Sequence, residues 1–142
     1  MGCYNSTVVN ANADKVWEKL NDFHDLSWSE NVVESVEKKG DKAGGQPGAK
    51  RILNGAFHET LLSMDADSRQ LTYSIDDGPD AVSKDNVSGY VGTVTVLPVT
   101  DTDSAFVEWK SEWESTREGG VADFCNPIYH ALLQDLKAHF KG

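Results

Sequence analysis

Basic residues are scarce in this chain, and long apolar runs are missing from it. Its 142 residues include 13 lysines and arginines against 23 aspartates and glutamates, which gives a formal net charge of −10. Because phosphate backbones and anionic lipid surfaces repel such a chain, we expect neither nucleic acid nor a membrane as its partner. No apolar run approaches the roughly 18 residues that indicate a membrane-spanning helix.

Cysteine is almost absent, and the usual cofactor motifs are missing. Cys3 and Cys125 lie far apart in the sequence, and the first residues form no secretory signal. A reducing compartment suits two such thiols, so we expect a cytoplasmic location. The four histidines have no zinc-binding spacing, and the glycine-rich stretch 40–48 lacks the Lys-Ser/Thr pair of a phosphate-binding loop. The sequence therefore predicts no metal site and no cofactor.

The length of the chain indicates one domain. At 142 residues it can bury a core that also surrounds an internal cavity. No repeat or low-complexity segment divides it. We therefore predict a single domain over residues 1–142.

The longest helical period lies at residues 121–140. Pro127 interrupts this period and predicts either a kink near Asn126 or a short lead-in before the main helix. The apolar residues recur in steps of three and four, which places them on one side of a helix. They are Val121, Phe124, Cys125, Ile128, Leu132, Leu136 and Phe140.

Most of the preceding chain alternates between apolar and polar residues, as strands do. Asn12 is placed to cap a short helix, residues 24–30 suggest a second short helix or turn, and residues 76–89 form a long polar loop. These features predict an α+β fold in which a curved antiparallel sheet of about seven strands wraps around the long C-terminal helix. The predicted strands are 4–10, 32–39, 49–53, 57–65, 71–75, 90–97 and 105–115.

Arg51 and Glu59 are the charged residues of most interest, because each alternates with apolar neighbours on its strand. A two-residue turn at Asn54-Gly55 pairs Arg51 with His58 and turns Glu59 to the other face. A three-residue turn that also includes Leu53 pairs Arg51 with Phe57 and sets Glu59 diagonally beside it. In the second case the pair lines a cavity wall, where it can bind a carbonyl or carboxylate group or move a proton. A purely structural or surface pair is the alternative.

Several short segments, taken with the order of the elements, carry a resemblance to a known family. They are residues 13–23, Pro47-Gly48-Ala49-Lys50-Arg51, Glu59, Leu71-Thr72-Tyr73-Ser74-Ile75, Val107-Glu108-Trp109 and the C-terminal helix. The whole chain thereby resembles the START-like, or SRPBCC, superfamily, in its polyketide cyclase/dehydrase and lipid-transport branch. The resemblance implies a helix-grip fold with an apolar cavity between the sheet and the long helix.

The same resemblance implies where a ligand binds. Arg51 and Glu59 match the positions at which plant enzymes of the superfamily are thought to hold a functional arginine and glutamate. We expect a pocket of several hundred Å³, as ligand sites commonly have. The predicted ligand-binding residues are Arg51, Glu59, Tyr73, Trp109, Trp113, Phe124 and Ile128.

The favoured function is the binding or carrying of a small hydrophobic molecule, lipid-like or polyketide-like. The alternative is a small-molecule cyclase, dehydratase or isomerase, in which Glu59 is the general acid or base and Arg51 stabilises oxyanion charge. The sequence does not decide whether the chain is an enzyme. The expected partner is the small ligand itself, bound by a monomer or a weak homodimer.

Overall fold

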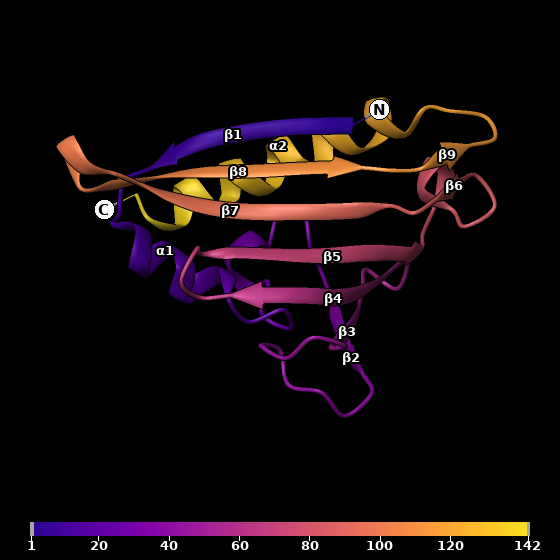
Figure 1. Cartoon of the computed structure of the whole chain (residues 1–142), viewed down its shortest axis with the longest axis horizontal. Coiled ribbons are helices and arrows are strands. Elements are labelled where there is room, and N and C mark those ends of the chain that lie inside the picture. Colours follow the sequence, from indigo (N-terminus) through magenta and orange to yellow (C-terminus); the bar gives the residue numbers. More distant parts are fainter. Residues whose placement is uncertain (1, 142) are drawn as a thin grey trace.

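The computed structural model describes residues 2–141, and a large antiparallel sheet dominates it (Figure 1). Seven strands pair in the order β1-β8-β7-β5-β4-β3-β2. Two very short strands, β6 (Val87–Ser88) and β9 (Ser115–Thr116), form a separate pair. The strands of the large sheet are β1 (Gly2–Val9), β2 (Val36–Lys39), β3 (Lys50–Leu53), β4 (Phe57–Asp65), β5 (Gln70–Asp77), β7 (Val91–Val99) and β8 (Ser104–Glu112).

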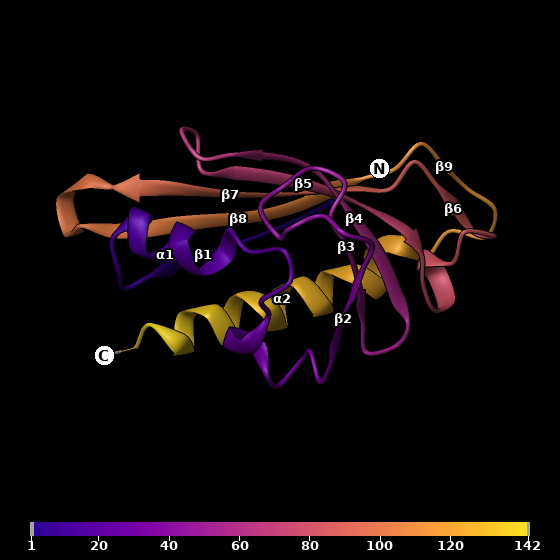
Figure 2. The same ribbon diagram turned by 90° about the horizontal axis from the view of Figure 1, so that it is seen from below.

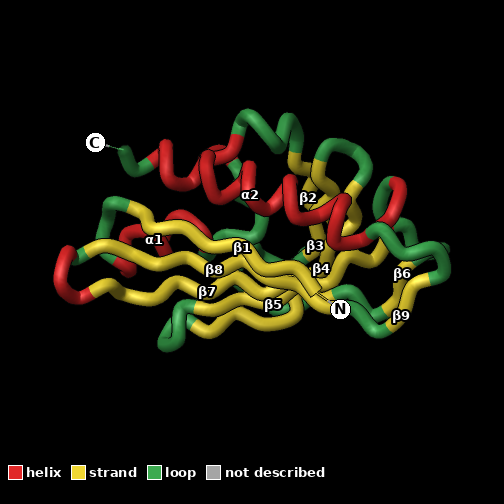
Figure 3. Tube along the Cα trace, turned by 90° about the horizontal axis from the view of Figure 1, so that it is seen from above, coloured by secondary structure: helices red, strands yellow, loops and turns green. Residues whose placement is uncertain are grey.

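The long helix α2 (Val121–His139) lies against one face of this sheet, alongside β1 (Figures 2 and 3). A shorter helix, α1 (Ala13–Leu20), follows β1. The predicted α+β helix-grip fold is therefore confirmed. The second of the two short helices expected after the first strand is a single 3₁₀ turn, η1 (Ser27–Ser29), and two further 3₁₀ turns are η2 (Asp80–Val82) and η3 (Thr100–Thr102).

Helix α1 begins where the sequence predicts. The Asn12 side chain accepts a hydrogen bond from the Lys15 backbone N–H at 2.9 Å, which caps the first turn. Val16, Trp17 and Leu20 are buried on its inner face. Neither α1 nor α2 has the length and apolar content to cross a bilayer.

Helix α2 is continuous through Pro127, so the expected lead-in before a separate main helix is wrong. Proline removes one backbone donor, which leaves the carbonyl four residues earlier, at Asp123, without its helical partner. Asp123 and Pro127 are both exposed, so water can hydrate that carbonyl. The buried residues of the helix are Val121, Cys125, Tyr129, Leu132, Leu133 and Leu136.

Most strand ends lie within two residues of the prediction, and three segments depart from it further. Residues 32–35 form a turn, and β2 begins only at Val36. The polar loop 76–89 contains η2 and the short strand β6. The last long strand, β8, ends at Glu112, and the chain then forms β9 against β6. Alternation alone did not reveal these breaks, because they depend on side chains from other parts of the chain.

Gly92 on β7 makes room for Tyr73 on the neighbouring strand β5. The two residues are cross-strand partners, and Tyr73 is 1% exposed. A Cβ atom added at Gly92 would lie 2.3 Å from Tyr73 Cζ and 2.6 Å from its hydroxyl oxygen. Real Cβ atoms do not approach so closely, so the tyrosine ring depends on a glycine at this position.

Replacing Gly92 with alanine should therefore destabilise the fold by about 1–3 kcal/mol, the usual range for overpacking. Urea unfolding followed by tryptophan fluorescence measures the change. Gly45→Ala is the matched control, since its added Cβ would have no contact closer than 3.9 Å. A Gly92→Ala protein as stable as the control would show that the Tyr73 ring is free to move aside.

Candidate functional site

The turn between β3 and β4 sets Arg51 directly opposite Glu59. Leu53 pairs with Phe57, so residues 54–56 form the loop. Asn54 and Gly55 both have positive φ angles, of 55° and 65°. Neither predicted turn is correct, because the three-residue loop starts one residue later than expected. The two charged residues share one face of the sheet.

Arg51 and Glu59 form a buried ion pair. Glu59 Oε1 accepts a hydrogen bond from Arg51 Nε at 2.8 Å and lies 2.7 Å from Arg51 Nη2. Arg51 Nη1 donates to the Phe23 carbonyl oxygen at 2.8 Å, and the guanidinium carbon lies 3.8 Å from the centre of the Phe23 ring. The two side chains are only 6% and 5% exposed. The protein therefore satisfies this arginine on several sides.

Burial raises the pKa of the Glu59 carboxyl group above its ordinary value, and the positive charge of Arg51 opposes the rise. The carboxyl group is thus easier to protonate than a glutamate in water. A group of this kind can accept or donate a proton in a dry site.

Four aromatic side chains join their polar groups beside this pair. Trp109 Nε1–H donates to the Tyr73 hydroxyl at 2.9 Å, and that hydroxyl donates to Tyr129 Oη at 3.0 Å. The hydroxyls of Tyr129 and Tyr90 also share a hydrogen bond. Burial raises the pKa of all three tyrosines, so their hydroxyls stay protonated at neutral pH.

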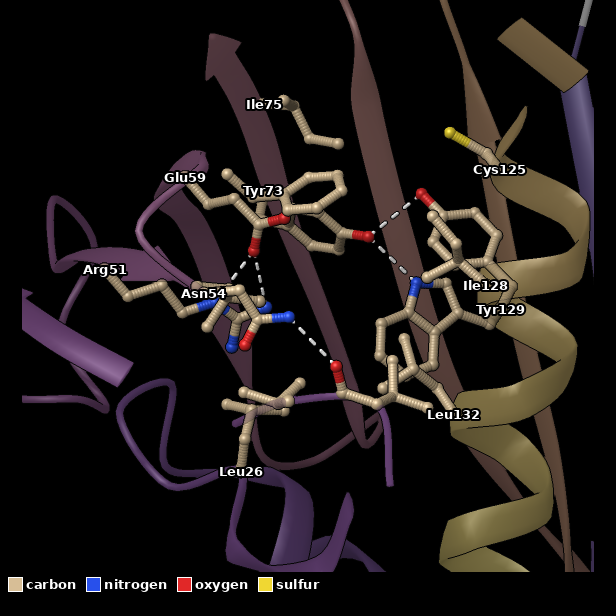
Figure 4. Close-up of a pocket in the computed structure, with 15 residues that line it drawn as sticks. Leu26, Arg51, Asn54, Glu59, Tyr73, Ile75, Cys125, Ile128, Tyr129 and Leu132 are labelled. Atoms are coloured by element: carbon tan, nitrogen blue, oxygen red, sulfur yellow. Dashed lines mark hydrogen bonds and ion pairs between the residues drawn. The ribbon is translucent and has the colours of Figure 1, made fainter. Parts of the chain in front are cut away.

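A cavity of about 50 Å³ lies between these side chains and α2 (Figure 4). Arg51, Glu59, Tyr73, Trp109 and Ile128 line it, as the sequence predicts, and so do Tyr129 and Cys125. Burial raises the pKa of the Cys125 thiol to about 11, so the cysteine is no nucleophile at neutral pH. The rest of the lining is largely apolar and includes Leu26, Val33, Leu53, Ile75 and Leu132.

The expected volume of several hundred Å³ is wrong for this conformation. Three large aromatic side chains, Tyr73, Trp109 and Tyr129, occupy the space beneath the helix, and the Trp109 and Tyr129 rings stack with their centres 5.3 Å apart. Ligand pockets typically measure about 300–1,000 Å³. A ligand larger than a few atoms therefore requires the walls to move.

Two residues expected to line the cavity lie outside its lining. Trp113 follows the end of β8 and stacks on Tyr90, with ring centres 5.9 Å apart and an interplanar angle of 5°. Phe124 stacks on Phe57, which lines the cavity in its place. The period of apolar residues predicted the correct face of α2. Packing decides which of the two stacked rings, Phe57 or Phe124, lines the cavity.

The Asn54 side chain forms hydrogen bonds with residues 32–35, the segment that covers the cavity near Val32 and Val33. Its Oδ1 accepts hydrogen bonds from the backbone N–H groups of Glu34 at 2.7 Å and Ser35 at 3.3 Å. Its Nδ2 donates to the Val32 carbonyl oxygen at 3.0 Å (Figure 4). The sequence Asn54-Gly55 predicted only a turn. It does not show whether the asparagine side chain also bonds another loop, so these hydrogen bonds could not be predicted.

Helix α2 holds the preceding part of the same loop. Asp135 accepts hydrogen bonds from the Ser29 hydroxyl at 2.7 Å and from Asn31 Nδ2 at 3.0 Å. Ser29 is fully buried. The loop between α1 and β2 is thus fixed at one end by α2 and at the other by Asn54.

A larger but more open groove lies elsewhere, with a volume of about 580 Å³. It is lined by Val8, Asn10, Thr102, Lys137, Lys141 and their neighbours, at the C-terminal end of α2. No buried ion pair or aromatic cluster lines it, so the smaller enclosed cavity is the better candidate. Within residues 2–141, no three histidine, cysteine, aspartate or glutamate side chains gather as a metal site would require.

The comparisons with known proteins identify the family and the fold of the chain. The model of the family described as polyketide cyclase/dehydrase and lipid transport matches residues 3–141. A solved structure of a Nitrosospira multiformis protein is 41% identical, with a TM-score of 0.95 over 100% of this chain and 97% of that one. No curated protein sequence matches the chain.

More distant structures share the fold alone. The XoxI protein of Bacillus cereus is 22% identical, with a TM-score of 0.80 over 98% of this chain and 94% of its own. Major latex-like protein 151 of Panax ginseng is 15% identical, with a TM-score of 0.78 over 100% of this chain and 98% of its own. From the family match and the 41% identical relative, we conclude that the chain belongs to the polyketide cyclase/dehydrase and lipid-transport family of the START-like (SRPBCC) superfamily.

Proposed function

We propose that this protein binds or carries a small hydrophobic molecule, lipid-like or polyketide-like, in the cavity between the sheet and α2. The observation that carries the proposal is a largely apolar cavity with one ion pair in its wall, formed by Arg51 and Glu59. Apolar walls with few polar groups are typical of sites for such ligands. The family to which the chain belongs includes lipid transport in its description.

Ligand entry requires the cavity to widen, and the lining residues are less buried on one side than on the other. Val32, Phe57 and Ile128 line the cavity and are each half-buried, whereas Tyr73, Trp109 and Tyr129 are almost fully buried. The half-buried residues lie on the α1–β2 loop, on β4 and on α2. Movement of residues 32–35 away from Ile128 would widen the cavity on this side, and it requires the hydrogen bonds between Asn54 and this segment to break.

Native mass spectrometry of the protein purified from its own host tests this function. We expect a species heavier than the chain alone, whose extra mass is released as a small apolar molecule on denaturation. Extraction then identifies the ligand. A protein that carries no added mass, and that also takes up no lipid or polyketide from a host extract, would contradict the proposal.

Catalysis is a second candidate function, favoured by the raised pKa of the buried Glu59 carboxyl group. A cyclase, dehydratase or isomerase needs such a group as its acid or base. The proposed oxyanion role of Arg51 has less support, because Glu59 and the Phe23 carbonyl already occupy three of its five N–H donors.

Glu59→Gln separates the carrier from the enzyme once the ligand is known. In an enzyme, turnover should fall by about 100-fold or more while affinity changes only a few-fold. In a carrier, no conversion of the bound ligand is detected in either protein. Conversion at equal rates by both proteins would exclude Glu59 as the catalytic group.

We also propose a cytoplasmic location and a monomer or weak homodimer. Both cysteines are reduced and buried, which fits a reducing compartment. The excess of acidic residues keeps copies of the chain apart by charge repulsion.

A further inference from the structure

The polar side chains that line the cavity differ in how fully they are hydrogen-bonded. Asn54 is bonded to the α1–β2 loop through both of its side-chain atoms. Tyr73 accepts from Trp109 and donates to Tyr129, and Tyr129 also bonds Tyr90. Protein groups therefore already satisfy the amide and the hydroxyls that face the cavity.

Arg51 is also bonded to protein groups, through three of its five N–H groups. Its Nε and Nη2 atoms lie 2.8 Å and 2.7 Å from Glu59 Oε1, its Nη1 bonds the Phe23 carbonyl, and the Phe23 ring covers one face of the guanidinium group. Because these contacts use three of the five N–H groups, an anionic ligand could approach this cation only beside Glu59. Glu59 is fixed beside Arg51 on the adjacent strand. Its negative charge would therefore repel a carboxylate ligand that approached Arg51.

Glu59 differs from these residues because its two oxygen atoms have unequal surroundings. Both contacts with Arg51 go to Oε1. Within residues 2–141, Oε2 accepts no hydrogen bond, although the residue is only 5% exposed and lines the cavity. Figure 4 shows the second oxygen of Glu59 turned away from Arg51, toward Tyr73. A carboxylate oxygen is an acceptor, and this one keeps some accessible surface, so a donor group of a ligand can reach it.

We propose that the ligand is a neutral molecule with a hydroxyl or phenol group, which donates a hydrogen bond to Glu59 Oε2, and that the cavity discriminates against carboxylic acids. The inference rests on the proposed function, because it names the class of ligand for the same cavity. The aromatic side chains of Tyr73, Trp109 and Tyr129 pack against the apolar part of the ligand. Arg51 favours the charged form of the carboxyl group and orients it, and makes no direct contact with the ligand.

Four matched probes test the inference on the wild-type chain. They share one methyl-substituted ring and differ in one group: toluene, 4-methylphenol, 4-methylbenzoate and 4-methylbenzylammonium. Titration at pH 7.5, followed in ¹H–¹⁵N spectra of the labelled protein, gives each Kd and shows whether residues around the cavity respond. We expect 4-methylphenol to bind roughly tenfold to a hundredfold more tightly than toluene, as a hydrogen bond to a charged acceptor implies. The benzoate should bind more weakly than either.

Each other outcome has a distinct meaning. If toluene and 4-methylphenol bind equally, Glu59 Oε2 makes no contact with the ligand and the inference fails while the proposed function stands. If the benzoate or the ammonium probe binds most tightly, the ligand class is an anion or a cation and the inference is overturned. If none of the four binds, the inference fails, and the native mass spectrum decides separately whether the proposed function stands.

Two variants locate the effect. Glu59→Gln should reduce the preference for 4-methylphenol over 4-methylbenzoate at least tenfold, because the repelling charge is gone and Arg51 is free to pair with the benzoate. Asp76→Asn removes the same charge from an exposed residue on β5, where Asp76 bonds Thr60 and Ser74. The Asp76 variant should keep the wild-type preference within about twofold, since exposed charges act weakly. Equal effects of the two changes would assign the preference to net charge alone and overturn the inference.

Discussion

Arg51→Met is expected to destabilise the fold by about 3–5 kcal/mol at pH 8, the usual cost of removing one partner from a buried ion pair. The change leaves Glu59 charged in a wall where it is 5% exposed, and it also deprives the Phe23 carbonyl of its donor. Urea unfolding of the variant and the wild type gives the difference in the free energy of unfolding.

The loss should shrink as the pH falls. Without Arg51 nothing opposes the effect of burial, so the pKa of Glu59 rises further above its ordinary value of 4.5. A folded-state pKa above the unfolded value means that the folded protein binds the proton more tightly. The penalty is therefore complete above the folded pKa and disappears below the unfolded one. The deficit measured at pH 5 should be smaller than the deficit at pH 8.

The double variant Arg51→Met/Glu59→Leu provides the control, because it removes both charges. Its stability should return to within about 2 kcal/mol of the wild type, as apolar replacements of buried pairs often do. If Arg51→Met is as stable as the wild type at pH 8, the ion pair is exposed to water in solution and the closed cavity described here is wrong.

Ile128→Trp is expected to weaken ligand binding by about tenfold to a hundredfold. Ile128 is a half-buried residue of α2 that lines the cavity of about 50 Å³. The larger indole ring of a tryptophan at this position would extend into that cavity. A ligand would have to expel that ring from an apolar site, which costs about 1.5–3 kcal/mol. Titration with the extracted natural ligand measures the change in Kd.

His130→Trp is the matched control for this variant. His130 is exposed on the same helix, two residues further along, and does not line the cavity. The control should bind the ligand with wild-type affinity. Equal weakening by both variants would place the ligand on the outside of α2 instead of beneath it.

Much of the site could be predicted from alternation in the strands. Arg51, Glu59, Tyr73 and Trp109 each follow a period of two with apolar neighbours, and all four are buried on the inner face of the sheet. That inner face was assigned correctly even though the turn at residues 54–56 was not. The reason is that the hydrophobic pattern sets the register wherever one face is buried.

Other parts of the site depend on packing that a single strand or helix does not encode. Tyr129 was missed on α2, although Cys125, Tyr129 and Leu133 follow one another in steps of four and all three are buried. A wider apolar stripe would have found it. The link between Asn54 and residues 32–35 and the fit of Tyr73 over Gly92 each join segments distant in sequence, so no local pattern contains them. The small cavity has the same origin, since its volume is what three aromatic rings leave empty.

The most direct test of the central claim is to locate the natural ligand in the complex, by intermolecular contacts in NMR spectra of protein with methyl-labelled isoleucine and leucine residues. Ligand contacts to the methyl groups of Ile75, Ile128 and Leu132 are expected, because these line the cavity beneath α2. The amides of residues 32–35 should shift as the loop moves to admit the ligand. With valine and alanine methyl groups labelled as well, contacts confined to the open groove around Val8 and Ala138, with the three cavity methyl groups unchanged, would contradict the account.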